Sequence, residues 1–178
     1  TAEAVRWVAF GGNGSAGTYA TACVVESCDF SNITFGANQR SPQHGITPAT
    51  TRGAVIRNNT FTSFAGQHIY VDSYKNFDLR IENNTATLCP QFISFVTQNW
   101  VRLTGNPAFA PLISSHVNVT VQGNTVGLAG PNSFYYDYNQ APYNATFFLY
   151  QYDRDVTALY NPTLIPGFKN INIQGNTI

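Results

Sequence analysis

The chain has 178 residues, with nine Lys and Arg against nine Asp and Glu, so its formal net charge is zero. Charged residues make up only 10% and hydrophobic residues 43%, which excludes a disordered tail or a long solvated helix. A neutral chain is not attracted to nucleic acid or to an anionic membrane, and no apolar run approaches the ~20 residues of a membrane span. The length is sufficient for one domain with a hydrophobic core.

A short strand followed by an asparagine bend recurs along the chain. The shared pattern is aliphatic, polar, polar or Gly, Asn, Thr, aliphatic, and its alternation is typical of a β-strand. Four segments fit without gaps, at residues 55–61, 80–86, 120–126 and 172–178. Residues 102–108 fit less well, and residues 24–30 carry Cys28 where the others carry Asn.

The spacing of this motif indicates a solenoid. The aligned positions are separated by 31, 25, 22, 18 and 52 residues, and periods of ~20–50 residues are typical of stacked repeats. The last spacing fits either two coils of about 26 residues or one coil with a long insertion. Asn tolerates the left-handed conformation of a tight bend, and its amide can bond equivalent amides one coil away. We therefore predict a structural ladder of Asn59, Asn84, Asn106, Asn124 and Asn176, with Asn58 and Asn83 pointing outward.

Further strands are expected between these motifs. Residues 67–72, 91–96 and 145–150 alternate polar and apolar side chains and predict the second and third faces of the coil. Residues 36–48 are expected to form a loop, and residues 127–144 a long insertion of the kind that carries function. The prediction is an all-β chain, with one right-handed parallel β-helix domain over residues 1–178, about six coils and an insertion near 127–144.

Glycosylation signals and cysteines bear on the compartment. Six triplets match the N-glycosylation pattern and favour a secreted, extracellular protein, although an Asn- and Thr-rich chain also makes such triplets by chance. The acceptors are Asn13, Asn32, Asn58, Asn83, Asn118 and Asn144. Cys23 and Cys28 could pair with each other, or one of them with Cys89, and one thiol remains in either case. The cysteine spacing does not fit zinc, and we expect neither a metal nor a cofactor. Because the chain begins at Thr1 without Met, we expect a processed product or a fragment of a larger chain.

The repeated strands resemble the right-handed parallel β-helix superfamily of carbohydrate-active proteins, which includes pectate-lyase-like and NosD-like repeats. Residues 46–61, 67–72 and 79–86 look like a stretch of the β-helical α-1,3-galactosidases. This local likeness covers about forty residues, with looser similarity from Val24 to Ile178, and such motifs are specific for fold rather than function. An acidic cluster follows the corresponding strand in those enzymes, whereas here Asp72 is followed by Ser73 and Tyr74.

Two pairs of residues are weak candidates for catalysis, because glycoside hydrolysis normally requires a pair of carboxyl groups. His68 and Asp72 would project from one strand face, and the alternative is a surface pair without a role. Asp153 and Asp155 would lie about 7 Å apart on an extended strand, and the alternative is a solvated turn. Binding candidates are aromatic: Tyr135, Tyr136, Tyr138 and Tyr143 could stack on sugars, contact a protein or cover the coil.

Two functions remain open from the sequence. The first is a non-catalytic, extracellular and glycosylated solenoid with a structural or assembly role. The last motif reaches Ile178 with no polar cap after it, so copies would stack end to end into a fibril. The second is a carbohydrate-active enzyme, a glycoside hydrolase or polysaccharide lyase, or a fragment of one. The expected partners are other copies of the chain and glycans or polysaccharide.

Overall fold

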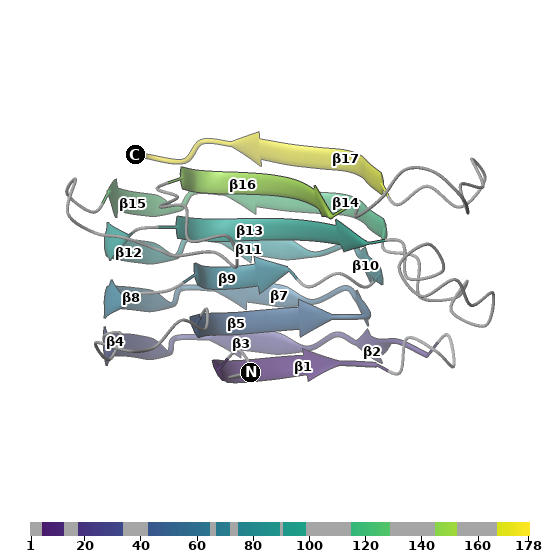
Figure 1. Cartoon of the computed structure of the whole chain (residues 1–178), viewed down its shortest axis with the longest axis horizontal. Coiled ribbons are helices and arrows are strands. Elements are labelled where there is room, and N and C mark those ends of the chain that lie inside the picture. The colour runs from purple at the N-terminus through teal and green to yellow at the C-terminus, as the bar shows by residue number, and fades with distance from the viewer. Residues whose placement is uncertain are drawn as a thin grey trace.

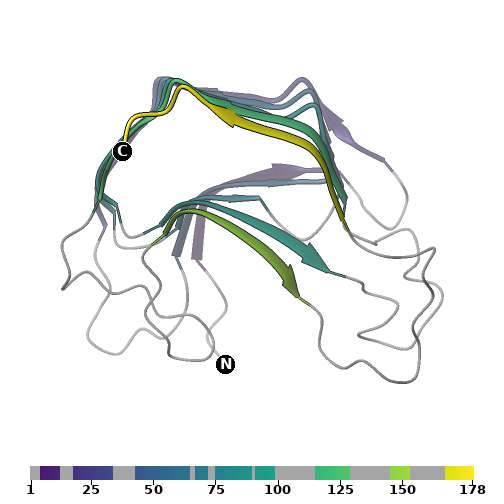
Figure 2. The same cartoon turned by 90° about the horizontal axis from the view of Figure 1, so that it is seen from above.

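The computed structural model describes residues 5–12, 18–33, 43–64, 67–71, 75–89, 91–98, 115–128, 145–152 and 167–178. All regular structure in these ranges is β-strand, and every strand pairing is parallel. The strands form three curled sheets, which we call A, B and C (Figures 1 and 2).

Sheet A has the order β1 (Val5–Gly11), β5 (Gln43–Ala49), β9 (Gln67–Val71), β13 (Gln91–Gln98) and β16 (Ala145–Tyr152). Sheet B has the order β2 (Ala20–Thr21), β6 (Thr51–Arg52), β10 (Lys75–Phe77), β14 (Ser115–Gln122), β11 (Arg80–Glu82), β7 (Val55–Arg57) and β3 (Val24–Glu26), and β17 (Gly167–Gln174) pairs with β14. Sheet C has the order β15 (Thr125–Leu128), β12 (Thr85–Cys89), β8 (Thr60–Phe64) and β4 (Asp29–Ile33).

The chain visits sheets A, B and C in the same order on each pass, and we call one pass a layer. The described strands form five layers: β1–β4, β5–β8, β9–β12, β13–β15, and β16–β17 with Thr177, which bridges to Thr125. Each strand pairs with its equivalent in the neighbouring layers, so the layers rise in chain order from the N-terminus (Figure 1). Backbone groups that one layer leaves open are paired by the next.

Two bends with a left-handed residue shape each layer. The first, which we call the upstream bend, lies at Ala22, Gly53, Asp78, Asn118 and Asn170, with φ between 51° and 70°. The second, the ladder bend, lies exactly one residue before each aligned Cys or Asn, at Ser27, Asn58, Asn83, Gly123 and Gly175, with φ between 54° and 65°. The left-handed residue is therefore not the ladder Asn, as we expected, but its predecessor.

The core lies between the sheets. One inward column on sheet B consists of Val25, Ile56, Ile81 and Val121, which are in register across four layers and are all buried. Facing positions on sheet C are Phe30, Phe61, Ala86 and Val126, which are buried as well. Full burial of a side chain such as Ile stabilises the fold by about 1.5–3 kcal/mol, so each layer is stabilised mainly by the layers beside it.

The described side chains of β5, β9 and β13 are buried on both faces of sheet A, apart from the partly exposed Ala49 and Tyr70. On β9, the neighbouring residues His68 and Ile69 are both fully buried, although they project to opposite sides of the strand. The predicted strands at 67–72, 91–96 and 145–150 all belong to this one sheet, and so do not form two faces of a coil. The prediction of a loop at 36–48 is wrong for residues 43–48, which lie in β5. The pairing of β5 with β9 ends at Ile46, before Pro48.

Register settles the two irregular spacings of the motif. Gln122 pairs with Gln174, so the 52-residue spacing is one layer with an insertion and not two coils. Asn84 bonds Asn124 directly, which leaves no position between them for Asn106, and Asn106 itself lies outside the described residues. This removes one expected coil, and the described strands form five layers where about six were expected.

Candidate functional site

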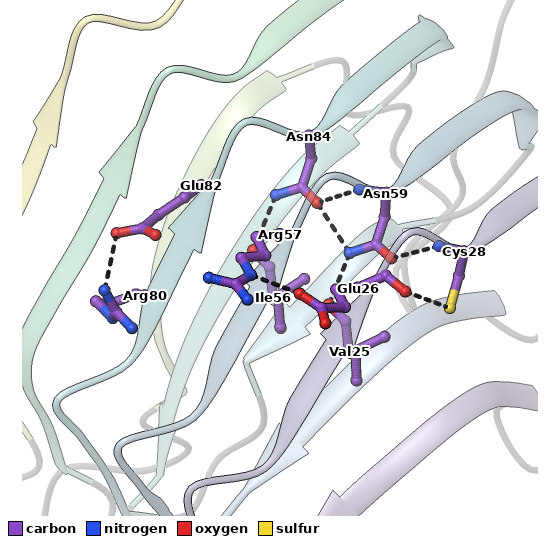
Figure 3. A network of polar contacts seen from close by, with 9 residues as sticks. All are labelled: Val25, Glu26, Cys28, Ile56, Arg57, Asn59, Arg80, Glu82 and Asn84. Carbon is purple, nitrogen blue, oxygen red and sulfur yellow. Dashed lines mark hydrogen bonds and ion pairs between the residues drawn. The ribbon is translucent and has the colours of Figure 1, made fainter.

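The ladder bend carries a continuous column of buried amides (Figure 3). The side-chain oxygen of Asn84 accepts from the backbone N–H of Asn59 at 3.0 Å and from its side-chain amide at 3.0 Å. Asn124 does the same for Asn84, and Asn176 for Asn124, at 2.8–3.0 Å. Each bond crosses one layer and points the same way, so the column has a direction from layer 1 to layer 5.

The second proton of each ladder amide bonds a strand carbonyl in the layer below. Asn59 donates to Val25, Asn84 to Ile56 and Asn124 to Ile81, at 3.0–3.1 Å. These amides are buried, and an unpaired buried polar group costs about 1–3 kcal/mol. The column therefore satisfies the polar groups that the bend would otherwise leave buried and unpaired.

Cys28 occupies the ladder position in layer 1. Its backbone N–H donates to the side-chain oxygen of Asn59 at 3.1 Å, and its thiol donates to the carbonyl of Glu26 at 3.4 Å. Asn124 and Asn176 make the equivalent bonds to the carbonyls two residues earlier. The thiol therefore makes one of the hydrogen bonds that a ladder amide makes. Cys23 bonds the Thr21 carbonyl in the same way. Both thiols are free, and the side chain of Cys89 lies outside the described residues.

A second, exposed stack of polar side chains runs over the upstream bend. Asn118 donates to the carboxylate of Asp78 at 3.0 Å, and Asn170 donates to Asn118 at 2.9 Å. At this bend the side chains of the left-handed residues themselves form the stack, and these side chains are exposed to solvent. In layers 2 to 5 the residue after the upstream-bend residue is Ala54, Leu79, Val119 or Ile171, and these apolar side chains pack in or against the core.

The outer face of sheet B, between the two bends, is charged and self-paired. Glu26, Arg57, Glu82 and Gln122 are in register there. Arg57 donates to Glu26 at 2.6 Å and Gln122 to Glu82 at 3.3 Å, while Arg80 lies 3.7 Å from Glu82 (Figure 3). Because Arg57 separates the two glutamates, they do not form a pair of carboxyl groups around an open site.

A cationic and aromatic cluster lies at the start of the same face. The Arg52 guanidinium lies 5.3 Å from the ring centre of Tyr19 and 5.1 Å from that of Phe77. The two rings meet edge to face at 5.5 Å. A cation over an aromatic ring is stabilised by about 0.5–1 kcal/mol when exposed, and this contact holds the first three layers together.

The outer face of sheet C is uncharged over most of its area and was not predicted from the sequence. Its strands carry hydroxyl side chains at alternate positions, and all of these are exposed. They are Ser31 on β4, Thr60 and Thr62 on β8, Thr85 and Thr87 on β12, Thr125 on β15 and Thr177 beyond β17. The signal in the sequence was Thr-x-Thr after Asn59 and after Asn84, where we noted only one Thr.

The predicted catalytic and sugar-binding residues are not brought together in the described structure. His68 is fully buried, with its ring stacked on Phe61 at 4.8 Å and edge to face with Phe92 at 6.2 Å. It therefore lies in the core and not on an accessible face. The other candidates lie outside the described residues: Asp72, Asp153, Asp155, Tyr135, Tyr136, Tyr138 and Tyr143.

Three predicted glycosylation acceptors have described side chains. Asn58, Asn83 and Asn118 are exposed and left-handed, and the amide of Asn83 lies over Gly123, where a Cβ would collide with it. In the first two triplets the middle residue is a ladder Asn and the third is an outward Thr. The triplets therefore also follow from bend and strand chemistry. Asn13 and Asn144, and the side chain of Asn32, lie outside the described residues.

Among the described residues, no group of three His, Cys, Asp or Glu could hold a metal ion, and no helix is long and apolar enough to cross a membrane. No family model, no curated protein and no solved structure matches the chain. The parallel strands in curled sheets are compatible with a β-solenoid, and the likeness to β-helical enzymes rests on the motif residues alone.

Proposed function

We propose that the chain is a right-handed parallel β-helix with a structural role, which assembles by stacking copies end to end. Parallel pairing of equivalent strands in every layer supports the solenoid. The observation that carries the assembly is the complementarity of the two outermost described layers. Among the described strands, β17 pairs only with β14 and β3 only with β7, and a strand edge that is left unpaired is a template for another chain.

The two edges are complementary in side chains. A copy placed with its layer 1 on β17 would set Val25 on Ile173, which is 38% exposed and ends the inward column. It would also set Glu26 beside Gln174, and the bond from Gln122 to Glu82 shows this pairing inside the molecule. The contact joins unlike surfaces, so copies would add head to tail and form an open filament unless the rotation closes a ring.

The ladder fits this contact less well. Asn176 would direct its backbone N–H toward residue 28 of the next copy, as Asn124 does toward Asn176. Cys28 offers sulfur, which is a weak acceptor compared with an amide oxygen. Replacing Cys28 with Asn supplies that oxygen, so the proposal expects Cys28→Asn to assemble more readily than the wild type.

The test compares Ile173→Lys with Gln122→Lys, which adds the same charge on the outer face one layer away from the edge. Sedimentation velocity over a concentration series and negative-stain electron microscopy measure assembly. Wild type and Gln122→Lys should form filaments, and Ile173→Lys should remain monomeric. A wild type that stays monomeric at every concentration, or an Ile173→Lys variant that assembles equally well, contradicts the proposal. Sugar release from a polysaccharide panel by the monomer would instead favour a carbohydrate-active enzyme.

An extracellular location with N-linked glycans belongs to the same proposal. Its support is the exposure of Asn58, Asn83 and Asn118. Asn58 and Asn83 occupy equivalent positions in adjacent layers, about 4.8 Å apart, so a glycan on one would crowd the other. Secretion from a eukaryotic host should therefore give a mass that falls on enzymatic deglycosylation, with only one of these two sites occupied per molecule. An unchanged mass would contradict it.

A further inference from the structure

The outer face of sheet C is a two-dimensional grid. Thr60, Thr85, Thr125 and Thr177 are in register in one column. Ser31, Thr62 and Thr87 are in register in a second column, two residues further along each strand. All seven are exposed, and the residues between them, such as Phe61 and Ala86, are fully buried. Figure 2 shows the strands of this sheet superposed along the stacking direction.

Strand geometry fixes the grid spacing. Neighbouring parallel strands lie about 4.8 Å apart, and residues two apart on a strand lie about 6.6 Å apart. Thr is stiff at χ1 because its Cβ is branched, so equivalent hydroxyls and methyls repeat with the backbone. The face therefore presents two columns of hydroxyls and methyls in layers 2 and 3, continued by the single hydroxyl of Ser31 in layer 1 and of Thr125 in layer 4.

The hydroxyls of this grid face water. The hydroxyl groups of the five grid threonines make no hydrogen bond to another described residue. These threonines are Thr60, Thr62, Thr85, Thr87 and Thr125. Among the described side chains on this face, the one charged group is Asp29, at its layer 1 edge. On the outer face of sheet B, by contrast, the carboxylates and guanidinium groups bond one another.

We propose that the outer face of sheet C binds ice. A crystal of water is a neutral, periodic surface whose oxygens donate and accept hydrogen bonds, and a neutral hydroxyl grid is complementary to it in charge and in hydrogen bonding. The methyls restrict the orientation of the water between the hydroxyls, and ordered water bridges polar groups nearly as well as a direct bond. A sugar-binding face would instead present flat aromatic rings, and none of the seven grid side chains is aromatic.

Layer 4 has no second hydroxyl, and Gly127 lies two residues after Thr125, where Thr-x-Thr would place it. The register between β12 and β15 runs through Ala86 and Val126 and shifts before Cys89 and Leu128. A Cβ built on Gly127 would lie 3.6 Å from the Ala86 carbonyl and 3.8 Å from the Thr87 Cα, which is ordinary contact. Its φ is not left-handed. Gly127→Thr would therefore complete Thr-x-Thr in that layer without strain, and should strengthen ice binding.

The experiment uses deglycosylated protein and measures thermal hysteresis, inhibition of ice recrystallisation and uptake of fluorescently labelled protein into a growing ice crystal. Thr85→Lys, in the centre of the grid, should reduce all three to the level of a non-binding protein. Gln122→Lys on sheet B is the matched control and should leave them unchanged. Thr85→Val tests the hydroxyl alone and keeps the branched shape. Circular dichroism and a melting curve establish that each variant is folded.

Three outcomes would overturn the inference. The wild type could fail to shape ice. Thr85→Lys could remain active while Gly127→Thr gains nothing, which would place any activity on another face. Labelled protein could be excluded from ice but sediment with insoluble cellulose or chitin, and lose that binding in Thr85→Lys. If the wild type fails to shape ice but still forms filaments, only the ice-binding inference is overturned. The assembly proposal then stands, because Ile173 and Thr85 lie on different surfaces.

Discussion

The two bends of each layer have the same left-handed backbone conformation but are followed by different side chains. Both use a residue with φ between 51° and 70°, and the two residues are five positions apart in every layer. At the ladder bend the next residue is a buried Asn in layers 2 to 4, and its amide bonds the layers above and below. At the upstream bend the next residue is apolar, and the amide stack of Asn118 and Asn170 lies on the outside.

This difference separates two roles that Asn combines in the sequence. Turning the chain requires only a residue that tolerates positive φ, and Ala, Ser, Asp, Asn and Gly all occupy these positions. Joining the layers requires an amide at a buried position, where water cannot replace a missing bond. The same side chain therefore contributes much at one bend and little at the other, and four changes test this.

The largest effect is expected from Asn84→Ala. It leaves the buried N–H of Asn59 without its acceptor and the Ile56 carbonyl without its donor, so the free energy of unfolding should fall by about 3 kcal/mol. Asn118→Gly is the matched change at the upstream bend, since glycine removes the amide without strain at φ +56°, and should cost under about 1 kcal/mol. Urea denaturation measures both, and equal losses would refute the comparison.

A change at the bend residue itself should have a smaller effect. Asn83→Val places a branched residue at φ +54° and should destabilise the protein by about 1–2 kcal/mol, whereas Asn83→Gly should be close to neutral. The difference in urea midpoint between these two variants isolates backbone strain from the exposed amide. If Val and Gly behaved alike, residue 83 would not be left-handed in solution.

Cys28→Asn should stabilise the single molecule. The new amide can donate to the oxygen of Asn59, as Asn59 does to Asn84, and a net hydrogen bond contributes about 0.5–1.5 kcal/mol. Cys28→Ser, which cannot reach that oxygen in the same way, serves as the control for loss of the thiol. The rise in melting temperature should appear at low concentration, where assembly does not contribute.

The smallest effect is expected on the outer face between the bends. Arg57→Ala removes the bond to Glu26, but both side chains are more than 40% exposed, and exposed ion pairs contribute about 0–1 kcal/mol. The loss should shrink further when salt is added. A loss as large as that of Asn84→Ala would mean that the outer face, and not the ladder, joins the layers.

The features that could be predicted from the sequence are those in which the same residue type recurs at equivalent positions. Asn59, Asn84, Asn124 and Asn176 repeat in type and context, so their stacking could be inferred. The upstream bend was missed because Ala22, Gly53, Asp78, Asn118 and Asn170 share only a tolerance for positive φ. Sheet A was divided between two faces because both sides of its strands are buried, which blurs the period of two.

The hydroxyl face was missed for a different reason. Thr60 and Thr62 are ordinary strand residues one at a time, and only the register between layers reveals that they form a lattice. The alternation put His68 on one strand face with Asp72 and left open whether that face was accessible, whereas the His68 ring packs on Phe61 in the core. Local pattern predicts which residues share a face, but not whether that face meets solvent.

The fixed distance between the bends limits where the chain can change in length. Ladder positions in successive layers are 31, 25, 40 and 52 residues apart, yet the left-handed residues within a layer are always five apart. The differences in length between layers therefore all lie outside this five-residue segment. A duplication in units of one whole layer, such as the 25 residues from Asn59 to Asn84, would preserve every column, so a solenoid of this kind can lengthen without redesigning its core.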